Sequence, residues 1–355
     1  VKAKRFELKM QIEKNEKGGD LLFCGFNQDN GCIAVGTKVG FRIFNADPFV
    51  RMFSRDIAGH KGGIRSVEML FRTSILALVG SSVSPPYSPH KVVIWDDHNR
   101  RILGEINFRS MVRAVKLRKD RIVVALKQRV YVYSLADFSL IDQIETLDNE
   151  LGLLALCPST STASVMACPG IKAGQLRIQT SSSTPLFIEC HQTALQSISV
   201  TLDGSMVATA SVKGTLVRVW NTSTGNMVAE LRRGSSEASI SSMCFSSDNK
   251  FLVVASNRKT IHVFALTQAN TEDAGSDESA HNRQSMMKGL PFSYFKSTWA
   301  AVTFQVDHVG QKICAFGSDP STVIVITSDG RYIKYGVDYD RKEVGQTALY
   351  EMVSA

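Results

Sequence analysis

Short runs of alternating hydrophobic and polar residues recur along most of the chain. Alternation with a period of two is typical of β-strands, whereas the period of about 3.6 residues that is typical of a helix is almost absent. Each run ends in a turn rich in Gly, Asp, Asn or Ser. The seven clearest runs occupy residues 41–48, 92–99, 130–137, 176–183, 217–225, 261–268 and 332–339.

These runs are nearly evenly spaced. Equivalent points in them are Ile43, Ile94, Val132, Ile178, Val219, Val263 and Ile333. Five of the six intervals lie between 38 and 51 residues, and one four-stranded propeller blade takes roughly 40–45 residues. The spacing therefore predicts an all-β protein, a seven-bladed β-propeller of four-stranded blades. Two β-sandwich domains are the alternative, and they would not require so regular a spacing.

The sixth interval is longer, at 70 residues, and corresponds to one blade plus an insertion. Residues 267–292 are polar at first, which predicts a long flexible loop inserted in the sixth blade. The apolar residues at the end of this loop are Met286, Met287, Leu290 and Phe292. Composition leaves two interpretations open, the start of a core strand or a loop that dips into a membrane.

Domain limits follow from the same pattern. We expect the propeller to occupy residues 18–340, preceded by an N-terminal segment at 1–17 and followed by a C-terminal tail at 341–355. The first residues are charged and lack the apolar stretch of a signal peptide. No run of about 18 apolar residues occurs, so we expect no membrane span.

Composition narrows the chemistry. The net charge of +8 makes acidic partners a natural expectation. The seven cysteines are scattered and never form Cys-x-x-Cys, which argues against a disulfide framework and against structural zinc, and fits a reducing cytosolic setting. No P-loop, His-Glu-x-x-His or Gly-x-Ser-x-Gly motif is present, and the histidines show no metal spacing. We therefore expect no enzyme, no catalytic residues, no cofactor and no metal.

The segment LRRG at 231–234 places two arginines side by side where a strand should end. Successive side chains of an extended chain point to opposite faces. Arg232 and Arg233 are therefore poorly placed to hold one anion together, but they can serve two anions. Gly234 would allow a sharp exit of the chain or a backbone N–H aimed at an anion.

Two similar segments flank the arginine pair, ATASVKGTLVRVW and VVASNRKTIHVF. Each contains a serine, a threonine four residues later and a basic residue on the following strand. These residues are Ser211, Thr215 and Arg218 in the first segment, and Ser256, Thr260 and His262 in the second. Hydroxyls with guanidinium or imidazolium donors suit phosphate, so the pattern favours two neighbouring phosphate sites. In the alternative interpretation the hydroxyls satisfy turn backbone groups and the arginines form a solvated edge.

These segments resemble the PROPPINs, seven-bladed propellers that bind polyphosphoinositides and carry a Phe/Leu-Arg-Arg-Gly hallmark. Further similar segments include VEMLFRTSILALVG, KVVIWDD and ETLDNELGLLALCP, so the resemblance covers roughly residues 18–340. Leu in place of Phe before the arginines is similar to a metazoan, WIPI-like branch. Lys259 departs from the pattern, because many relatives have Gly there.

The resemblance implies two sites, for the headgroups of phosphatidylinositol 3-phosphate and phosphatidylinositol 3,5-bisphosphate. By motif, the first site would use His191, Ser211, Thr215, Arg218 and Arg232. The second would use Arg233, Ser256, Thr260 and His262. The resemblance also implies that the loop at 267–292 inserts Met286, Met287, Leu290 and Phe292 into the bilayer.

The same resemblance implies a peripheral membrane scaffold of autophagy. We expect a monomer in the cytoplasm, recruited to the phagophore or preautophagosomal membrane, with endosomes as a further candidate location. Its expected protein partner is an autophagy lipid-transfer protein that binds the early blades. A propeller that binds only proteins is the main alternative. Nucleic acid is a weaker one, because no aromatic residues are interleaved with the basic ones around LRRG.

Overall fold

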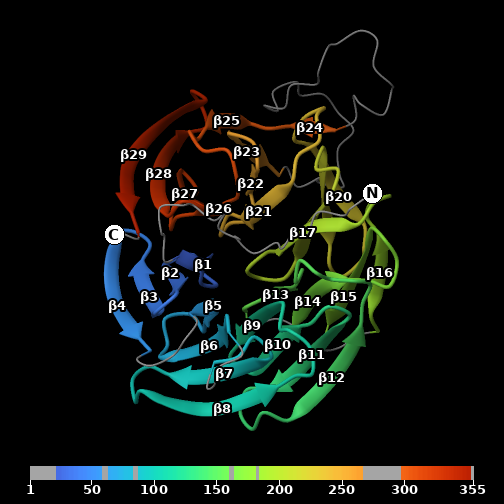
Figure 1. Cartoon of the computed structure of the whole chain (residues 1–355). Helices are drawn as coiled ribbons and strands as arrows, with labels where there is room; N and C mark the ends of the chain where they lie inside the picture. Colours follow the sequence, from blue (N-terminus) through green and yellow to red (C-terminus); the bar gives the residue numbers. More distant parts are fainter. Residues whose placement is uncertain are drawn as a thin grey trace, which may run out of the picture.

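The computed structural model describes residues 21–57, 63–82, 87–159, 164–180, 184–266 and 297–352. They form seven sheets arranged in a ring, a seven-bladed β-propeller in which no described residue is helical (Figure 1). The predicted fold class is confirmed, and the alternative of two sandwich domains is wrong.

The four main strands of each blade are antiparallel to their neighbours, and the first of them lies nearest the centre of the ring (Figure 1). Blades 1 and 2 consist of β1 (Leu21–Phe26), β2 (Cys32–Thr37), β3 (Gly40–Asn45), β4 (Val50–Asp56), and β5 (Ile64–Met69), β6 (Ile75–Gly80), β7 (Lys91–Asp96), β8 (Arg101–Asn107). Blades 3 and 4 consist of β9 (Ala114–Arg118), β10 (Arg121–Ala125), β11 (Arg129–Ser134), β12 (Leu140–Glu145), and β13 (Ala155–Leu156), β14 (Val165–Pro169), β15 (Gln175–Thr180), β16 (Leu186–Glu189).

The remaining blades contain the insertion. Blade 5 consists of β17 (Leu195–Val200), β18 (Met206–Ser211), β19 (Leu216–Asn221), β20 (Met227–Arg232) and the added short strand β24 (Thr298–Trp299). Blade 6 consists of β21 (Ile240–Phe245), β22 (Phe251–Ser256), β23 (Thr260–Ala265) and β25 (Val302–Gln305). Blade 7 consists of β26 (Lys312–Phe316), β27 (Thr322–Thr327), β28 (Arg331–Asp338) and β29 (Glu343–Glu351).

The seven runs that set the predicted spacing are the third strands of the seven blades, β3, β7, β11, β15, β19, β23 and β28. The insertion lies in the sixth blade, as predicted, since β23 and β25 are neighbours in one sheet but are separated in sequence by residues 266–301. The loop residues Met286, Met287, Leu290 and Phe292 lie outside the described residues, as does the segment 1–17.

The prediction of a C-terminal tail at 341–355 is wrong for most of that segment. Residues 343–351 form β29, which pairs with β28 as the outermost strand of blade 7. Almost all of β29 is exposed, so it lacks the alternation of buried and exposed positions that marks a strand in the sequence. The propeller therefore extends to residue 351.

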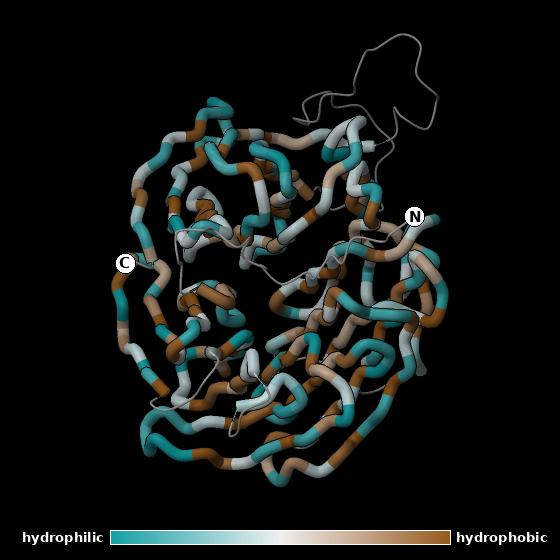
Figure 2. Tube along the Cα trace, viewed as in Figure 1, coloured by the Kyte–Doolittle hydropathy of each residue, from teal (hydrophilic) through white to brown (hydrophobic). Residues whose placement is uncertain are grey.

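The core lies between neighbouring blades. Second strands such as β22 are buried along almost their whole length, whereas outer strands such as β4 are mostly exposed. Hydrophobic positions recur along every blade (Figure 2). In the seam between blades 5 and 6, Val217 and Leu231 pack with Leu252 and Phe264. All seven cysteines are free thiols and all but Cys244 are buried, as expected of small core residues.

Side-chain packing closes the ring between blades 7 and 1. Each of these blades is built from four consecutive strands, so no strand in the described part of the chain is exchanged between them. Tyr332 is 1% exposed, and its hydroxyl donates a hydrogen bond of 2.8 Å to the Ala46 carbonyl. Its ring stacks on Phe49, with 4.4 Å between centroids. Among the described residues, blades 7 and 1 are therefore joined by side-chain contacts such as those of Tyr332, and not by a shared strand.

Candidate functional site

The two adjacent arginines lie at the outer end of blade 5 and point to opposite sides. Arg232 is the last residue of β20, and its Nε donates to Ser297 Oγ at 2.8 Å. Arg233 follows, and its Nε donates to the Gly214 carbonyl at 2.9 Å while its Nη2 donates to the Ser236 carbonyl. Both side chains are buried. The prediction that neighbouring arginines diverge is confirmed.

Strand register shows which residues accompany Arg232. Thr209 is opposite Arg218, Arg218 is opposite Glu230, and Arg232 lies two residues beyond Glu230. Because residues two apart share a face, these four side chains lie on one face of blade 5. His191, which follows the last strand of blade 4, reaches the same face, with Nε2 3.0 Å from Thr209 Oγ1. The first basic seam therefore lies between blades 4 and 5.

Arg218 is fixed firmly within this first basic seam. Its Nε and Nη2 both lie 2.9 Å from Oε2 of Glu230, and its Nη1 donates to the Cys190 carbonyl. Burial, and then the positive charge of Arg218, lowers the pKa of His191 to about 4. His191 is therefore neutral at pH 7, and each of its ring nitrogens can accept or donate according to its tautomer.

The turn between β18 and β19 lies beside the arginine pair and bonds to the backbone of Arg233. The Ser211 carbonyl accepts a hydrogen bond from the Gly214 N–H, and the Thr215 carbonyl accepts one from the Arg233 N–H. Gly214 has a φ of +61°, and a Cβ there would lie 1.7 Å from the Ala238 carbonyl oxygen. Only glycine fits this position. Gly234 has no positive φ and has open space around it, so the glycine that shapes this region is Gly214.

The second basic seam lies between blades 5 and 6 and receives Arg233. Thr260 and His262 share one face of β23, and Val254, opposite His262, packs in the core between these two blades. Burial lowers the pKa of His262 to about 4, and the positive charge of Arg233 adds to this effect. Ser256 ends β22 and is 1% exposed.

Arg258 adds a second guanidinium to this seam, and the sequence pattern did not single it out. The backbone N–H of Arg258 donates to Ser256 Oγ at 3.2 Å, and the Nη2 of its side chain donates to the Glu237 carbonyl. The pKa of Arg233 is lowered mainly by burial and to a smaller extent by the positive charge of Arg258. In the described part of the chain, no carboxylate forms an ion pair with Arg233 or Arg258. The two guanidinium groups therefore bond to the carbonyls of adjacent residues, and the described residues provide neither of them with an ion-paired carboxylate.

Lys259 does not disturb the second seam. The resemblance led us to expect a glycine at this position, but the backbone of Lys259 is not in the left-handed region. Its Nζ turns to Asp307 at 2.6 Å, in a pair that is largely exposed. The lysine therefore leaves the turn intact, and its charge is already partnered.

The returning end of the long insertion is tied to the first seam. β24 pairs in parallel with β20, with Thr298 opposite Leu231 and Trp299 opposite Arg232 (Figure 1). Ser297, just before β24, receives the hydrogen bond from Arg232. The chain leaves blade 6 after β23 and comes back on blade 5, so the ends of the insertion lie on the two blades that form the second seam.

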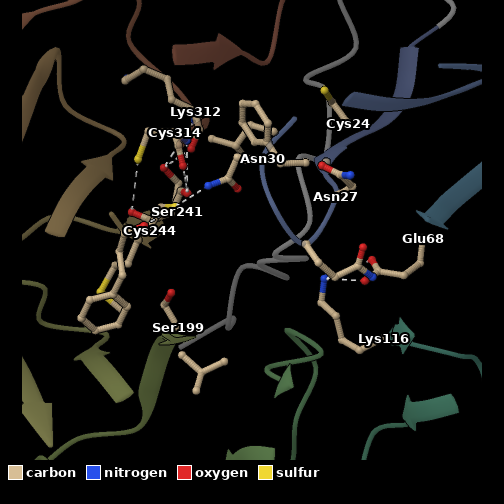
Figure 3. A pocket seen from close by; sticks show the side chains of 18 of the residues that line it. Cys24, Asn27, Asn30, Glu68, Lys116, Ser199, Ser241, Cys244, Lys312 and Cys314 are labelled. Carbon is tan, nitrogen blue, oxygen red and sulfur yellow. Dashed lines mark hydrogen bonds and ion pairs between the residues drawn. The ribbon is translucent and has the colours of Figure 1, made fainter. Parts of the chain in front are cut away.

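A cavity of about 360 Å³ lies at the centre of the ring, lined by the first strands of several blades (Figure 3). Its charged lining residues already have partners. Lys116 Nζ lies 3.0 Å from Glu68, and the fully buried Lys312 donates to the His308 and Gly310 carbonyls. Asn30 donates to Cys244 Sγ at 3.4 Å. The cavity therefore offers no buried charge that requires a ligand.

Two further features are absent from the described residues. No group of three or more His, Cys, Asp or Glu there is placed to hold a metal ion. Nor does any helix in those ranges have the length and apolar character needed to cross a membrane.

The two partly buried, neutral histidines, His191 and His262, predict a pH-dependent stability. Their pKa values fall from about 6.5 in the unfolded chain to about 4 in the fold, so the stabilisation is present above pH 6.5 and is lost as the pH falls towards 4. We expect each histidine to contribute about 2 kcal/mol of this loss. Urea denaturation at pH 7 and pH 4.5 of wild type and His262→Gln measures it. An equally steep pH dependence in the variant would contradict the pKa shift.

The fold and the two basic seams together define the class of the protein. It is a seven-bladed propeller with two basic seams on either side of one blade, each containing a buried arginine, a neutral histidine and hydroxyl groups. A family model described as PROPPIN matches residues 21–318. The chain belongs to the PROPPIN family, as the resemblance of its motifs implied.

Named relatives agree with this assignment. Autophagy-related protein 18e of Arabidopsis thaliana is 34% identical over 342 residues, covering 95% of this chain and 89% of the relative. Autophagy-related protein 18 of Dictyostelium discoideum is 31% identical, covering 90% and 89%. The solved structure of Kluyveromyces marxianus Hsv2 aligns with a TM-score of 0.76 and 22% identity, covering 94% of this chain and 99% of that one. This structural likeness shows the fold.

Proposed function

We propose that this chain is a peripheral membrane effector that binds phosphatidylinositol 3-phosphate and phosphatidylinositol 3,5-bisphosphate, one headgroup in each basic seam. The observation that carries the proposal is the divergence of Arg232 and Arg233 into separate seams. A guanidinium buried beside hydroxyls and a neutral imidazole presents planar donors to phosphate oxygens. Binding and scaffolding, rather than catalysis, is the activity of this class of propeller.

The first site would use His191, Ser211, Thr215, Arg218 and Arg232, and the second Arg233, Ser256, Thr260 and His262. Negative charge from a bound phosphate would favour protonation of the neutral histidine in each seam. Since both seams border blade 5, two lipids in one leaflet can be held at once. Binding of the first lipid then raises the effective concentration of the second, so weak individual sites give firm attachment.

The insertion would add apolar contact with the bilayer. Its residues Met286, Met287, Leu290 and Phe292 are apolar, and the loop leaves and rejoins the propeller at the blades that carry the seams. Insertion of such side chains contributes about 0.8 kcal/mol per buried CH₂. Basic residues near an anionic leaflet contribute about 1 kcal/mol each.

Attachment of this kind would serve the recruitment of autophagy machinery. Relatives of this chain are named as autophagy-related proteins, and one similar structure is a complex of KlAtg21 with the coiled-coil of AgAtg16. We therefore place the protein in the cytoplasm and on the phagophore or preautophagosomal membrane, with endosomes as a further location. An autophagy lipid-transfer protein would bind the early blades. A scaffold that binds proteins without lipid is the competing function.

Co-sedimentation with liposomes tests the proposal. Liposomes containing phosphatidylinositol 3-phosphate or phosphatidylinositol 3,5-bisphosphate should pellet the protein. Liposomes brought to the same surface charge with phosphatidylserine serve as the control and should leave most of it in solution. Equal binding to both kinds of liposome would show attraction by net charge alone, and no binding to either would favour the protein scaffold.

A further inference from the structure

The two basic seams differ in charge, because among the described residues only the first has a carboxylate that is ion-paired with one of its arginines. In the first seam, Glu230 lies on the same face as Arg218 and Arg232 and holds Arg218 at 2.9 Å. The Glu230 and Arg218 side chains are 19% and 27% exposed, so water screens the pair only partly. In the second seam, the guanidinium groups of Arg233 and Arg258 bond to the carbonyls of two adjacent residues, Ser236 and Glu237, and neither forms an ion pair with a carboxylate among the described residues.

Glu230 also determines how Arg218 can meet a ligand. Three of its nitrogens are already engaged, two by Glu230 Oε2 and one by the Cys190 carbonyl. The position of Arg218 is therefore set before any ligand arrives, and its charge is largely balanced. Arg258, by contrast, is exposed, and among the described residues its guanidinium donates to the Glu237 carbonyl and pairs with no carboxylate, so its charge remains available to an anion.

We infer that Glu230 is the specificity-determining residue that restricts the first seam to a singly phosphorylated inositol headgroup, whereas the second seam accepts a doubly phosphorylated one. This inference rests on the proposed function. Each phosphate monoester brings about −1.5 to −2 charges at pH 7. An additional phosphate in the first seam meets the Glu230 carboxylate across a partly desolvated gap, whereas in the second it meets the guanidinium of Arg258.

Soluble headgroups and single-site variants test this inference. Arg233→Gln leaves the first seam intact, and Arg232→Gln leaves the second. Calorimetric titration would use inositol 1,3-bisphosphate and inositol 1,3,5-trisphosphate, the headgroups of the singly and doubly phosphorylated lipids. We expect the Arg232→Gln protein to prefer the trisphosphate by about 10-fold, and the Arg233→Gln protein to show no such preference.

Adding Glu230→Gln to Arg233→Gln keeps a hydrogen-bond acceptor for Arg218 but removes the charge. The trisphosphate should then bind about 10-fold more tightly, with a smaller gain for the bisphosphate. Glu230→Asp, which keeps the charge, should leave the preference unchanged. Glu145→Gln removes one charge from an exposed pair on blade 3 and should change neither affinity.

The possible failures are distinguishable. If the Arg233→Gln and wild-type proteins bind neither headgroup, the proposed function itself fails. If they bind, but Glu230→Gln raises both affinities equally or not at all, the proposed function stands and the role of Glu230 is overturned. Unfolding by urea identifies any variant that has lost its fold. If Glu230→Gln has lost it, Glu230→Asp provides the test, because a changed preference between the two headgroups in a variant that keeps the charge would overturn the role of Glu230.

Discussion

Replacement of Arg232 and Arg233 together by glutamine is expected to weaken binding to phosphatidylinositol 3-phosphate liposomes by at least about 100-fold, and each single replacement by about 10-fold. Each guanidinium lies in a different seam, so a single variant keeps one lipid site whereas the double variant keeps none. Co-sedimentation across a range of lipid concentrations gives the three affinities.

The chain contains a matched control for this experiment. Arg100 and Arg101 form a second adjacent pair, exposed at the start of β8 on blade 2. Replacing both by glutamine removes the same charge far from the seams along the ring, and should change liposome binding by less than about threefold. Equal losses in the two double variants would mean that net charge, rather than the seams, attracts the membrane.

Replacement of Tyr332 by alanine is expected to destabilise the fold by about 4 kcal/mol. The side chain is almost fully buried in the seam that closes the ring, where it stacks on Phe49 and bonds to the Ala46 carbonyl. Tyr332→Phe should cost only about 1 kcal/mol, since it loses the hydrogen bond alone. Urea denaturation measures both values.

Tyr350 provides the comparison for this prediction. Tyr350 lies on blade 7, as Tyr332 does, and its ring centroid is 5.1 Å from that of Phe49 on blade 1. Its side chain, however, is 48% exposed. Its replacement by alanine should therefore cost less than about 1.5 kcal/mol. If Tyr332→Ala proved as mild as Tyr350→Ala, closure of the ring would not depend on packing in this seam.

Much of the fold could be predicted from the sequence, because the second and third strands of each blade are buried between neighbours. Their regular hydrophobic positions gave the blade spacing, as at Ile178 and Val219. Outer strands face solvent on much of their surface, so their composition resembles that of loops. For this reason β29 was mistaken for a tail, although its pairing with β28 is the most extensive in the propeller.

The candidate site was only partly predictable. The spacing of serine, threonine and a basic residue indicated both segments, and the alternation of strand side chains indicated that the arginines diverge. Glu230 was missed because its proximity to Arg218 follows from cross-strand register rather than from sequence distance. Gly214 was missed for a similar reason, since its close approach to Ala238 comes from a segment more than 20 residues away.

The central claim is that each arginine of the pair serves a separate headgroup site, and the number of ligands bound per chain tests it most directly. Native mass spectrometry with inositol 1,3-bisphosphate would count them for wild type, Arg232→Gln, Arg233→Gln and the double variant. The two seams predict two ligands for wild type, one for each single variant and none for the double variant. One ligand on the wild-type protein, lost with either arginine, would contradict the claim.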